Sequence, residues 1–220
     1  MMLMDSYRIN HARVRRAFSS SAKSYDEHAV LQREIGDRLL DHLSCTKIEP
    51  RRIIDIGCGT GYFTESIVKN AKHVFATDLS EELLEKARER LGDNDKITFQ
   101  KENGMAITFT SDKFDAVFMA NVIHVIENPQ KVLKESYRVL KDNGLLVITS
   151  FTNHGMKLLE IIKLGFRFIK VWGKPPRHTH FSPDSLCSLI ESTGFSIEES
   201  KILGNKTKSL FIIGKKKIII

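Results

Sequence analysis

At 220 residues the chain is long enough for one domain with a substantial core, and no apolar run approaches the roughly 20 residues of a membrane span. Its three cysteines are odd in number and lack metal-ligand spacing, which argues against a disulfide framework or a metal site and predicts a reducing, cytoplasmic setting. The net charge of +7 suits an acidic partner or an anionic membrane surface, but the basic residues are scattered without a nucleic-acid signature, so nucleic acid is not expected.

The first predicted element is helical and extends to about residue 44. Its apolar residues recur at intervals of three and four, which places them on one helical face. They are Val30, Leu31, Ile35, Leu39, Leu40 and Leu43. The Met-Met-Leu-Met start has neither a basic region nor a long apolar stretch, so we expect no signal peptide.

A short apolar run then ends in Asp55, and three glycines follow it at alternate positions. We expect a buried parallel strand, a tight turn at Gly57, Gly59 and Gly61, and a helix beginning near Tyr62. Glycine has no Cβ, so this turn can bend sharply and let a ligand approach bare backbone. A strand, a glycine turn and a helix form the first half of a nucleotide-binding unit.

The spacing of the glycines argues against a dinucleotide. In the dinucleotide fingerprint the third glycine comes one position later, where this chain has Tyr62. Asp55 would also place negative charge where a pyrophosphate has to lie. A carboxylate there suits a ligand with an ammonium group and no phosphate, and S-adenosylmethionine (SAM) has that character. A turn used for packing alone is the alternative interpretation.

A second apolar run, 74–77, ends in Asp78. A carboxylate about 20 residues beyond a glycine turn can accept hydrogen bonds from both hydroxyl groups of a ribose. Asp78 could instead cap the following helix, for which Ser80, Glu81 and Glu82 form a typical start. In combination with the glycine turn, ribose binding is the preferred interpretation.

Strands and helices alternate through the rest of the chain, which predicts an α/β fold with a doubly wound sheet. Two late strands are separated by a loop too short for a parallel crossover, so they must pair antiparallel. The sheet is therefore expected to be mostly parallel and seven-stranded, with one antiparallel strand near its edge. Strands are predicted at 53–56, 73–77, 97–100, 114–119, 145–150, 196–203 and 208–214, and helices at 62–70, 80–91, 129–140 and from 182 onward.

Over about residues 50–214 the chain resembles the class I SAM-dependent methyltransferases, which have a Rossmann-like fold. The glycine motif of that family is matched by Asp55 and the glycines that follow, its ribose acid by Asp78, and its fourth strand by 114–118 running into 120–124. The resemblance implies SAM as cofactor and S-adenosylhomocysteine as product.

One position departs from the pattern of that family. After the third strand the family often has Gly-Asp-Ala, with the Asp binding the adenine amino group, and this chain has Glu102-Asn103-Gly104. The amide oxygen of Asn103 can still accept that hydrogen bond, and Met105 could supply an apolar face for the adenine. The cofactor-binding set implied by the resemblance is Asp55, Gly57, Cys58, Gly59, Gly61, Asp78, Leu79, Asn103, Gly104 and Asn121.

The segment from Arg16 to Asp26, followed by Gln32, resembles the opening of the malonyl-carrier-protein O-methyltransferases of biotin synthesis. In such enzymes the leading helices fold over the cofactor, and a tyrosine tends to face it. The resemblance implies that residues 1–45 cover the cofactor site and that Tyr25 contributes to cofactor binding and catalysis. The alternative is that Tyr25 only anchors these helices to the core.

Residues after the fourth and fifth strands should form the acceptor pocket, because ligands of open α/β sheets lie beyond the carboxyl ends of the strands. His124, His178 and His180 are candidate catalytic bases, with packing or a solvated loop as the alternative for each. Residues 151–182 are predicted to form an insertion that serves as acceptor pocket or lid. Within it, 155–172 reads as an amphipathic helix that could cap the pocket, lie on an anionic membrane or pack as ordinary core.

The leading hypothesis is a single domain, residues 1–220, that transfers a methyl group from SAM to a small apolar or amphipathic acceptor. A malonyl-carrier-protein O-methyltransferase is the narrower alternative. A nicotinamide-dependent oxidoreductase and a non-catalytic binding module are the alternatives from other classes. The acceptor, the methylated atom and the oligomeric state stay open at this stage.

Overall fold

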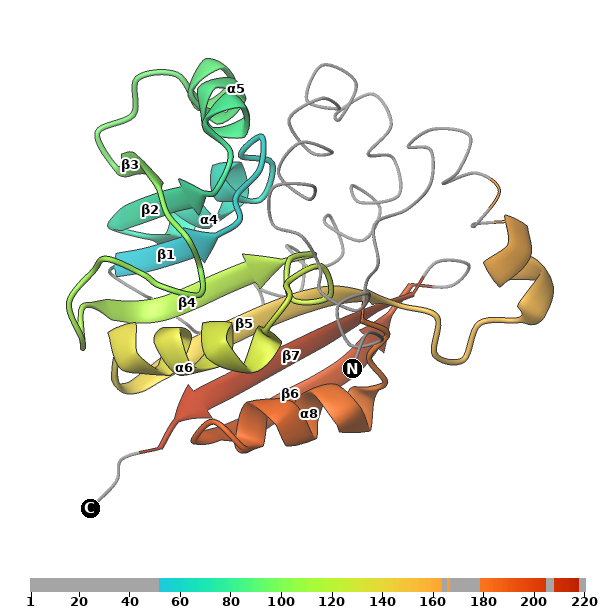
Figure 1. Cartoon of the computed structure of the whole chain (residues 1–220). Helices are drawn as coiled ribbons and strands as arrows, with labels where there is room; N and C mark the ends of the chain where they lie inside the picture. Colours follow the sequence, from blue (N-terminus) through green and yellow to red (C-terminus); the bar gives the residue numbers. More distant parts are fainter. Residues whose placement is uncertain (1–51, 164–165, 167–178, 205–207, 218–220) are drawn as a thin grey trace, which may run out of the picture.

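The computed structural model describes residues 52–163, 166, 179–204 and 208–217. Within these ranges the chain is organised around one seven-stranded sheet (Figure 1). The predicted amino-terminal helices, residues 1–45, lie outside the described residues, and so do Tyr25 and His178. The division of the chain into a 1–45 cover, a central domain and a 151–182 insertion therefore stays a prediction.

The seven strands run along the chain in the order that the sequence predicts. They are β1 (Arg52–Ile56), β2 (His73–Asp78), β3 (Ile97–Lys101), β4 (Phe114–Ala120), β5 (Leu140–Thr152), β6 (Phe195–Leu203) and β7 (Lys208–Lys216). Their order across the sheet is β3-β2-β1-β4-β5-β7-β6. Neighbours pair in parallel except for β7, which is antiparallel to both β5 and β6. The predicted sheet with one reversed strand near its edge is confirmed.

Helices connect the strands: α4 (Thr64–Asn70), α5 (Glu81–Leu91), α6 (Pro129–Val139) and α8 (Pro183–Glu191). All of these except α4 begin at a capping side chain. The Ser80 hydroxyl accepts from the N–H of Leu83 at the start of α5, and the Asn128 side chain accepts from the N–H of Lys131 at the start of α6. Ser182 and Ser185 form a capping box at the start of α8.

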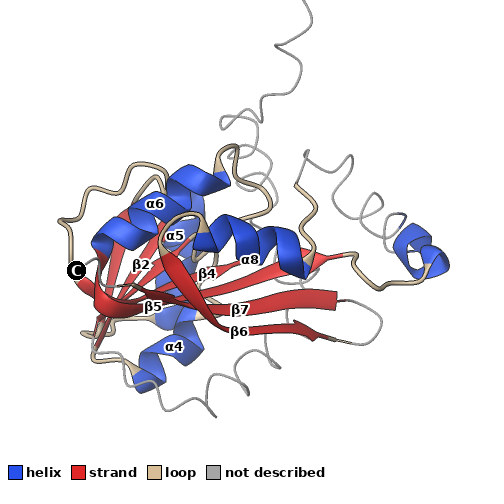
Figure 2. Ribbon diagram, turned by 90° about the horizontal axis from the view of Figure 1, so that it is seen from below, coloured by secondary structure: helices blue, strands red, loops and turns tan. Residues whose placement is uncertain are grey.

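The helices divide between the two faces of the sheet, and each face has its own apolar cluster. On one face, α6 and α8 pack Val132, Leu133 and Leu186 against strand residues such as Val117 and Ile148. On the other face, α4 and α5 pack Ile67, Val68 and Leu84 against Val74 and Ala76. Figure 2 shows α6 and α8 on one side of the sheet and α4 on the other. Because its strands are covered on both faces, the sheet reads in the sequence as short, nearly continuous apolar runs.

The fifth strand is longer than predicted: it begins at Leu140 instead of residue 145, and the turn-forming residues Asp142, Asn143 and Gly144 lie inside it. Strand pairing to β4 shifts between Phe114 and Ala116, so residues 141–144 form a bulge rather than a loop. Asn143 has a φ of 60° within this bulge. The turn residues therefore mark the irregularity correctly but not the end of the strand.

The predicted 155–172 helix is described only in part. Residues 158–163 and 166 are helical, and the intervening and following residues lie outside the described ranges. Leu158, Leu159 and Phe166 have more than two thirds of their surface exposed, at 72%, 71% and 72%. Within the described ranges, no helix combines the length and the apolar character that a bilayer span requires.

Candidate active site

A pocket opens beyond the carboxyl ends of β1, β2, β3 and β4, where the α/β sheet changes its winding direction. In the sheet, β1 lies between β2 and β4. The connection from β1 to β2 and the connection from β4 to β5 therefore run in opposite directions, and the pocket lies between them. Its lining residues are Ile56, Gly57, Gly59, Asp78, Leu79, Ser80, Leu83, Glu102, Asn103, Gly104, Met105, Ala120, Asn121, Val122, Val125, Ile126 and Val132.

The glycine turn after β1 forms the floor of this pocket. The backbone N–H groups of Gly57 and Cys58 both donate to the carbonyl of Thr77 on β2, at 2.7 and 2.9 Å. Gly57 has a φ of 72°, and a Cβ there would come within 2.4 Å of a Val122 methyl group. Gly59 has a φ of 57° with no atom within 4 Å of the place for a Cβ. The turn is therefore tightly packed at Gly57 and open at Gly59, where it lines the pocket.

Asp78, the last residue of β2, lies in the pocket wall beside this turn. One carboxylate oxygen accepts from the N–H of Gly59 at 3.0 Å and the other accepts from the N–H of Ser80 at 2.8 Å. Burial raises the pKa of Asp78, and the hydrogen bonds from backbone N–H groups oppose that rise. Asp78 thus joins the glycine turn to the start of α5.

Asp55 has a different environment from the one that the sequence suggests. Its side chain is 1% exposed, accepts from the Thr64 hydroxyl on α4 at 2.6 Å, and is absent from the pocket lining. Burial raises the pKa of Asp55 to about 7, with the negative charge of Asp78 adding to the rise and the Thr64 hydrogen bond opposing it. Asp55 is a buried acid beneath the turn, without direct access to the pocket.

The loop after β3 supplies a third side of the pocket. The Asn103 side-chain oxygen accepts from the N–H of Met105 at 3.0 Å, and the Asn103 carbonyl accepts from the N–H of Ala106 at 2.8 Å. Gly104 lies close to Ile56 and Val132, since a Cβ at residue 104 would come within 3.0 Å of an Ile56 methyl group. The predicted adenine-binding residue Asn103 therefore sits in a compact turn at the pocket edge.

Asn121, the residue after β4, carries an unsatisfied oxygen. It has a φ of 55°, a left-handed conformation that Asn tolerates better than most residues. Among the described residues, the Asn121 side-chain oxygen is the one buried side-chain nitrogen or oxygen atom that has no hydrogen-bond partner. A buried acceptor without a partner costs roughly 1–3 kcal/mol. Because Asn121 lines the pocket, a ligand N–H or O–H can supply the missing hydrogen bond.

The structure brings seven of the predicted cofactor residues to one pocket: Gly57, Gly59, Asp78, Leu79, Asn103, Gly104 and Asn121. Asp55, Cys58 and Gly61 belong to the same turn or its strand but are not among the lining residues. A Cβ at Gly61 would meet Leu91 at 2.9 Å, so Gly61 serves close packing of the turn on α5. Tyr25 lies outside the described residues.

Of the predicted catalytic histidines, His124 and His180 lie among the described residues, and neither is part of the described pocket lining. His124 is half-buried, and its Nδ1 lies 3.1 Å from the Ser150 hydroxyl on β5. The His124 carbonyl accepts from the N–H of Thr179 at 2.8 Å, which brings the segment containing His180 close to His124. His180 is exposed, and His178 lies outside the described residues. A catalytic role for these histidines stays a prediction.

Sequence reasoning missed most of the apolar lining, above all Val122, Val125, Ile126 and Val132. Val132 lies near the start of α6. Its place in the pocket becomes apparent only when the structure shows that β4 ends, and α6 begins, at the same edge of the sheet. Glu102 was also missed as a wall residue; its carboxylate is 5% exposed and accepts from Gln100 and from the N–H and hydroxyl of Thr108. No group of three metal-ligating side chains occurs among the described residues.

The order of the sheet, the bare glycine turn and the acid at the end of β2 together define an adenosyl-cofactor domain of the class I methyltransferase fold. A family model described as "Methyltransferase domain" matches residues 54–148. The magnesium protoporphyrin IX methyltransferase of Synechocystis PCC 6803, solved with bound SAH, shares the fold with a TM-score of 0.73 at 16% identity, covering 94% of this chain and 100% of that one.

Two curated relatives are more similar in sequence. The malonyl-[acyl-carrier protein] O-methyltransferase of Halorhodospira halophila is 34% identical over 149 residues, which cover 67% of this chain and 50% of the relative. The protein of that name from Legionella pneumophila is 35% identical over 149 residues, which cover 67% of this chain and 52% of the relative. The chain belongs to the class I SAM-dependent methyltransferases. It spans about half the length of the curated relatives it matches.

Proposed function

We propose that this chain transfers a methyl group from SAM to a small acceptor bound at the carboxyl end of the sheet. The observation that carries the proposal is the position of Asp78. Its carboxylate lines the pocket next to the bare backbone of Gly59 and is fixed there by two backbone N–H groups. A carboxylate so placed is suited to accept hydrogen bonds from ribose hydroxyl groups.

The residues of the pocket fit SAM in charge and in shape. Gly59 leaves room for the close approach of a ligand, Asp78 provides the ribose acceptor, and Asn121 offers an oxygen that needs a donor. Met105 and Val132 supply apolar surface for an adenine ring. When bound, SAM supplies an electrophilic methyl group on a cationic sulfur. The protein's contribution is to hold the two reactants in line and to exclude water.

The acceptor side of the proposal rests on the residues that follow β4. Val122, Val125 and Ile126 form an apolar wall next to Asn121, which favours an acceptor with an apolar body. The exposed apolar residues of helix 158–163 are consistent with an amphipathic acceptor or an anionic surface nearby. A cytoplasmic location, predicted from cysteine usage, remains part of this proposal.

A malonyl group on an acyl carrier protein is the second candidate acceptor. The relatives at 34% and 35% identity carry that activity in their names. A carboxylate acceptor is already ionised at neutral pH and needs no general base. The net charge of +7 would favour encounter with an acidic carrier.

The first test is calorimetry of the purified protein with S-adenosylhomocysteine and, separately, with NAD. Binding of the homocysteine compound but not of NAD is expected. Binding of NAD alone would replace the proposal by an oxidoreductase, and binding of neither would indicate a non-catalytic module.

The second test is transfer of a labelled methyl group from SAM. Malonyl-carrier protein, a quinol and a simple phenol are offered in parallel under the same conditions. Labelling of the carrier alone would assign the second candidate, and labelling of the quinol or phenol would assign a free small molecule. Cofactor binding without transfer to any member of a wider acceptor panel would contradict the enzymatic proposal.

A further inference from the structure

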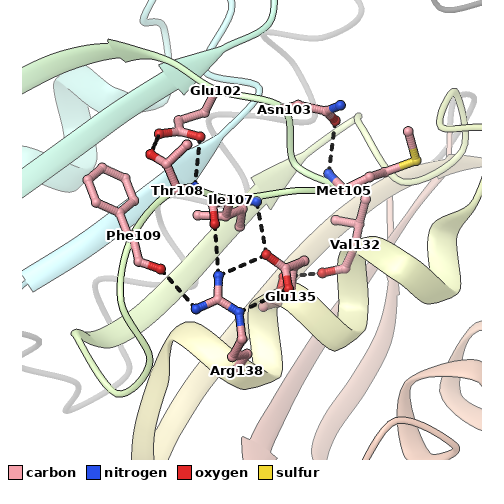
Figure 3. Close-up of polar contacts among 10 residues, drawn as sticks. Glu102, Asn103, Met105, Ile107, Thr108, Phe109, Val132, Glu135 and Arg138 are labelled. Atoms are coloured by element: carbon pink, nitrogen blue, oxygen red, sulfur yellow. Dashed lines mark hydrogen bonds and ion pairs between the residues drawn. The ribbon is translucent and has the colours of Figure 1, made fainter.

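The loop between β3 and β4 forms one wall of the pocket, yet it contains no regular strand or helix. Its turn at 103–106 is closed by the hydrogen bonds of Asn103 described above. Such a turn needs further contacts to keep a fixed position, because its other backbone groups lack sheet or helix partners. The structure supplies those contacts from two sides (Figure 3).

On the strand side, Glu102 fixes the returning chain. Its carboxylate accepts from the N–H of Thr108 at 3.1 Å and from the Thr108 hydroxyl. The turn thus begins and ends at residues that are bonded to each other. Ile107, immediately before Thr108, places its side chain in the core with 6% exposure.

On the helix side, two residues of α6 bind the same returning chain. The Glu135 carboxylate accepts from the N–H of Ile107 at 2.9 Å. The Arg138 guanidinium donates to the carbonyl of Ile107 and to the carbonyl of Phe109, both at 2.9 Å. Both backbone groups of Ile107 are therefore bound by side chains of one helix.

Glu135 and Arg138 also fix each other. Arg138 donates through two nitrogens to the two carboxylate oxygens of Glu135, at 3.0 and 2.8 Å. The hydrogen bond with Arg138 is the main reason that the pKa of Glu135 is lowered, and the same bond raises the pKa of Arg138. Such a bidentate ion pair has a defined geometry that a lysine side chain cannot reproduce.

The same helix reaches the pocket itself. Val132, Glu135 and Arg138 are spaced three residues apart, so they lie along one side of α6. Val132 lines the pocket against Gly104, and the other two hold the chain that follows the turn. A single rigid helix thereby determines both the wall and the position of the loop that faces it.

We propose that Glu135 and Arg138 are positioning residues for the adenine side of the pocket: they fix the 103–106 turn relative to α6, and through it they set affinity and selectivity for the nucleobase. This inference rests on the proposed function. It assigns neither residue a contact with the ligand.

The test compares two ligands that differ only at the base, S-adenosylhomocysteine and S-inosylhomocysteine, in which an oxygen replaces the adenine amino group. Calorimetry gives a dissociation constant for each. Arg138→Met is expected to weaken S-adenosylhomocysteine binding roughly tenfold and to lower the preference for it over the inosine analogue. Glu135→Gln, which keeps the size of the side chain, is expected to shift the same ratio in the same direction.

Lys216→Met is the matched control. Like Arg138, Lys216 is a long cation that binds a carboxylate and a backbone carbonyl, those of Asp112 and Leu140, at 2.8 and 2.6 Å. Both partners lie outside the pocket lining. The control should lower the thermal midpoint and leave the ratio of the two dissociation constants unchanged.

The outcomes separate the two proposals. If the unaltered protein binds neither ligand, the proposed function fails and this inference fails with it. If it binds S-adenosylhomocysteine but Arg138→Met and Glu135→Gln keep the wild-type ratio, the positioning role is wrong and the function stands. An equal change of the ratio in Lys216→Met would likewise overturn the positioning role. If Arg138→Met does not fold, Glu135→Gln decides the question by the same ratio.

Discussion

The two sides of the pocket are built in different ways. On the side of β1, β2 and β3, two polar wall residues are held by hydrogen bonds from backbone groups: Asp78 by the N–H of Gly59 and Ser80, and Asn103 by the N–H of Met105. On the side of β4, the wall is mainly apolar and includes Asn121, whose side-chain oxygen has no partner among the described residues. The first side is complete in itself, whereas the second is completed by a ligand.

Under the proposed function, the β1–β3 side would hold the cofactor and the apolar β4 side would leave room for different acceptors. A side with fixed hydrogen bonds can bind one ligand with little reorganisation. An apolar side with a single polar atom sets few constraints on the shape of its ligand. Each of the following predictions therefore addresses one side, or the contact between them.

The contact between Gly57 on the β1 side and Val122 on the β4 side should be the position most sensitive to substitution. In Gly57→Ala the new Cβ would lie 2.4 Å from a Val122 methyl group, at a φ of 72° that alanine disfavours. We expect destabilisation by about 3 kcal/mol, measured by chemical denaturation, since overpacking costs about 1–3 kcal/mol and a left-handed alanine about 1–2 kcal/mol. Adding Val122→Ala should recover the overpacking part and leave the backbone part. No recovery in the double variant would mean that the two sides do not touch as described.

The cofactor side should lose most of its affinity when Asp78 is removed. Asp78→Ala deletes the proposed ribose acceptor and leaves the N–H of Gly59 without its partner. We expect S-adenosylhomocysteine to bind about a hundredfold more weakly by calorimetry, because charged hydrogen bonds contribute about 1.5–3 kcal/mol each. Asp115→Ala is the control: Asp115 also accepts from a backbone N–H, that of Arg52 at 2.7 Å, but it is not a pocket residue. Equal losses in both variants would refute the ribose assignment.

Asp55 should make the protein less stable as the pH rises. Its folded pKa of about 7 lies above the ordinary value of 3.8, so the folded state binds the proton more tightly than the unfolded state does. The contribution of Asp55 is fully present below pH 3.8 and is lost as the pH rises through about 7.

Asp55→Asn should remove this dependence. We expect the free energy of unfolding of the variant, relative to wild type, to rise by about 2.5 kcal/mol between pH 5 and pH 8 in denaturation curves, because about two pKa units of stabilisation are lost by the wild type over this interval. A difference between the two proteins that is the same at every pH would show that Asp55 ionises normally. Because Asp55 is beneath the turn, this variant also tests whether the turn needs a charge there.

The β4 side of the pocket should show the smallest effect. Asn121→Gly removes the unpaired oxygen but keeps a residue that favours a φ of 55°. We expect the free protein to have an unchanged or higher thermal midpoint. Calorimetry should show that S-adenosylhomocysteine binds about tenfold more weakly. Asn143→Gly is the matched control, since Asn143 is also left-handed, at a φ of 60°, but lies in the β5 bulge. Ligand affinity unchanged in Asn121→Gly would mean that the oxygen has no ligand partner.

The sequence predicted the pocket lining on the β1–β3 side better than the lining on the β4 side, and the reason is physical. Gly57, Gly59 and Asp78 act through backbone geometry and local spacing, which a linear sequence carries directly. The antiparallel pairing of β6 and β7 also followed from the short connection between them. These features depend on neighbours in sequence, so a pattern was sufficient.

The features that the sequence did not predict depend on contacts between distant residues. Asp55 was expected to act on the ligand charge directly, but the start of α4 brings Thr64 against its carboxylate and separates it from the pocket. Glu135 and Arg138 carry no visible motif for a loop that lies some 30 residues earlier in the chain. Val122 and Val132 read as ordinary core until the sheet places them at the pocket.

The position of β7 has a consequence for how the protein reaches its fold. This strand is the last described element of the chain, yet it pairs with β5 and β6 and carries the fully buried Leu210, Phe211 and Ile212. During synthesis, β5 must therefore keep an open edge until the segment ending at Lys216 has left the ribosome. The sheet is therefore completed by pairing between residues far apart in the chain, which forms more slowly than local contacts do.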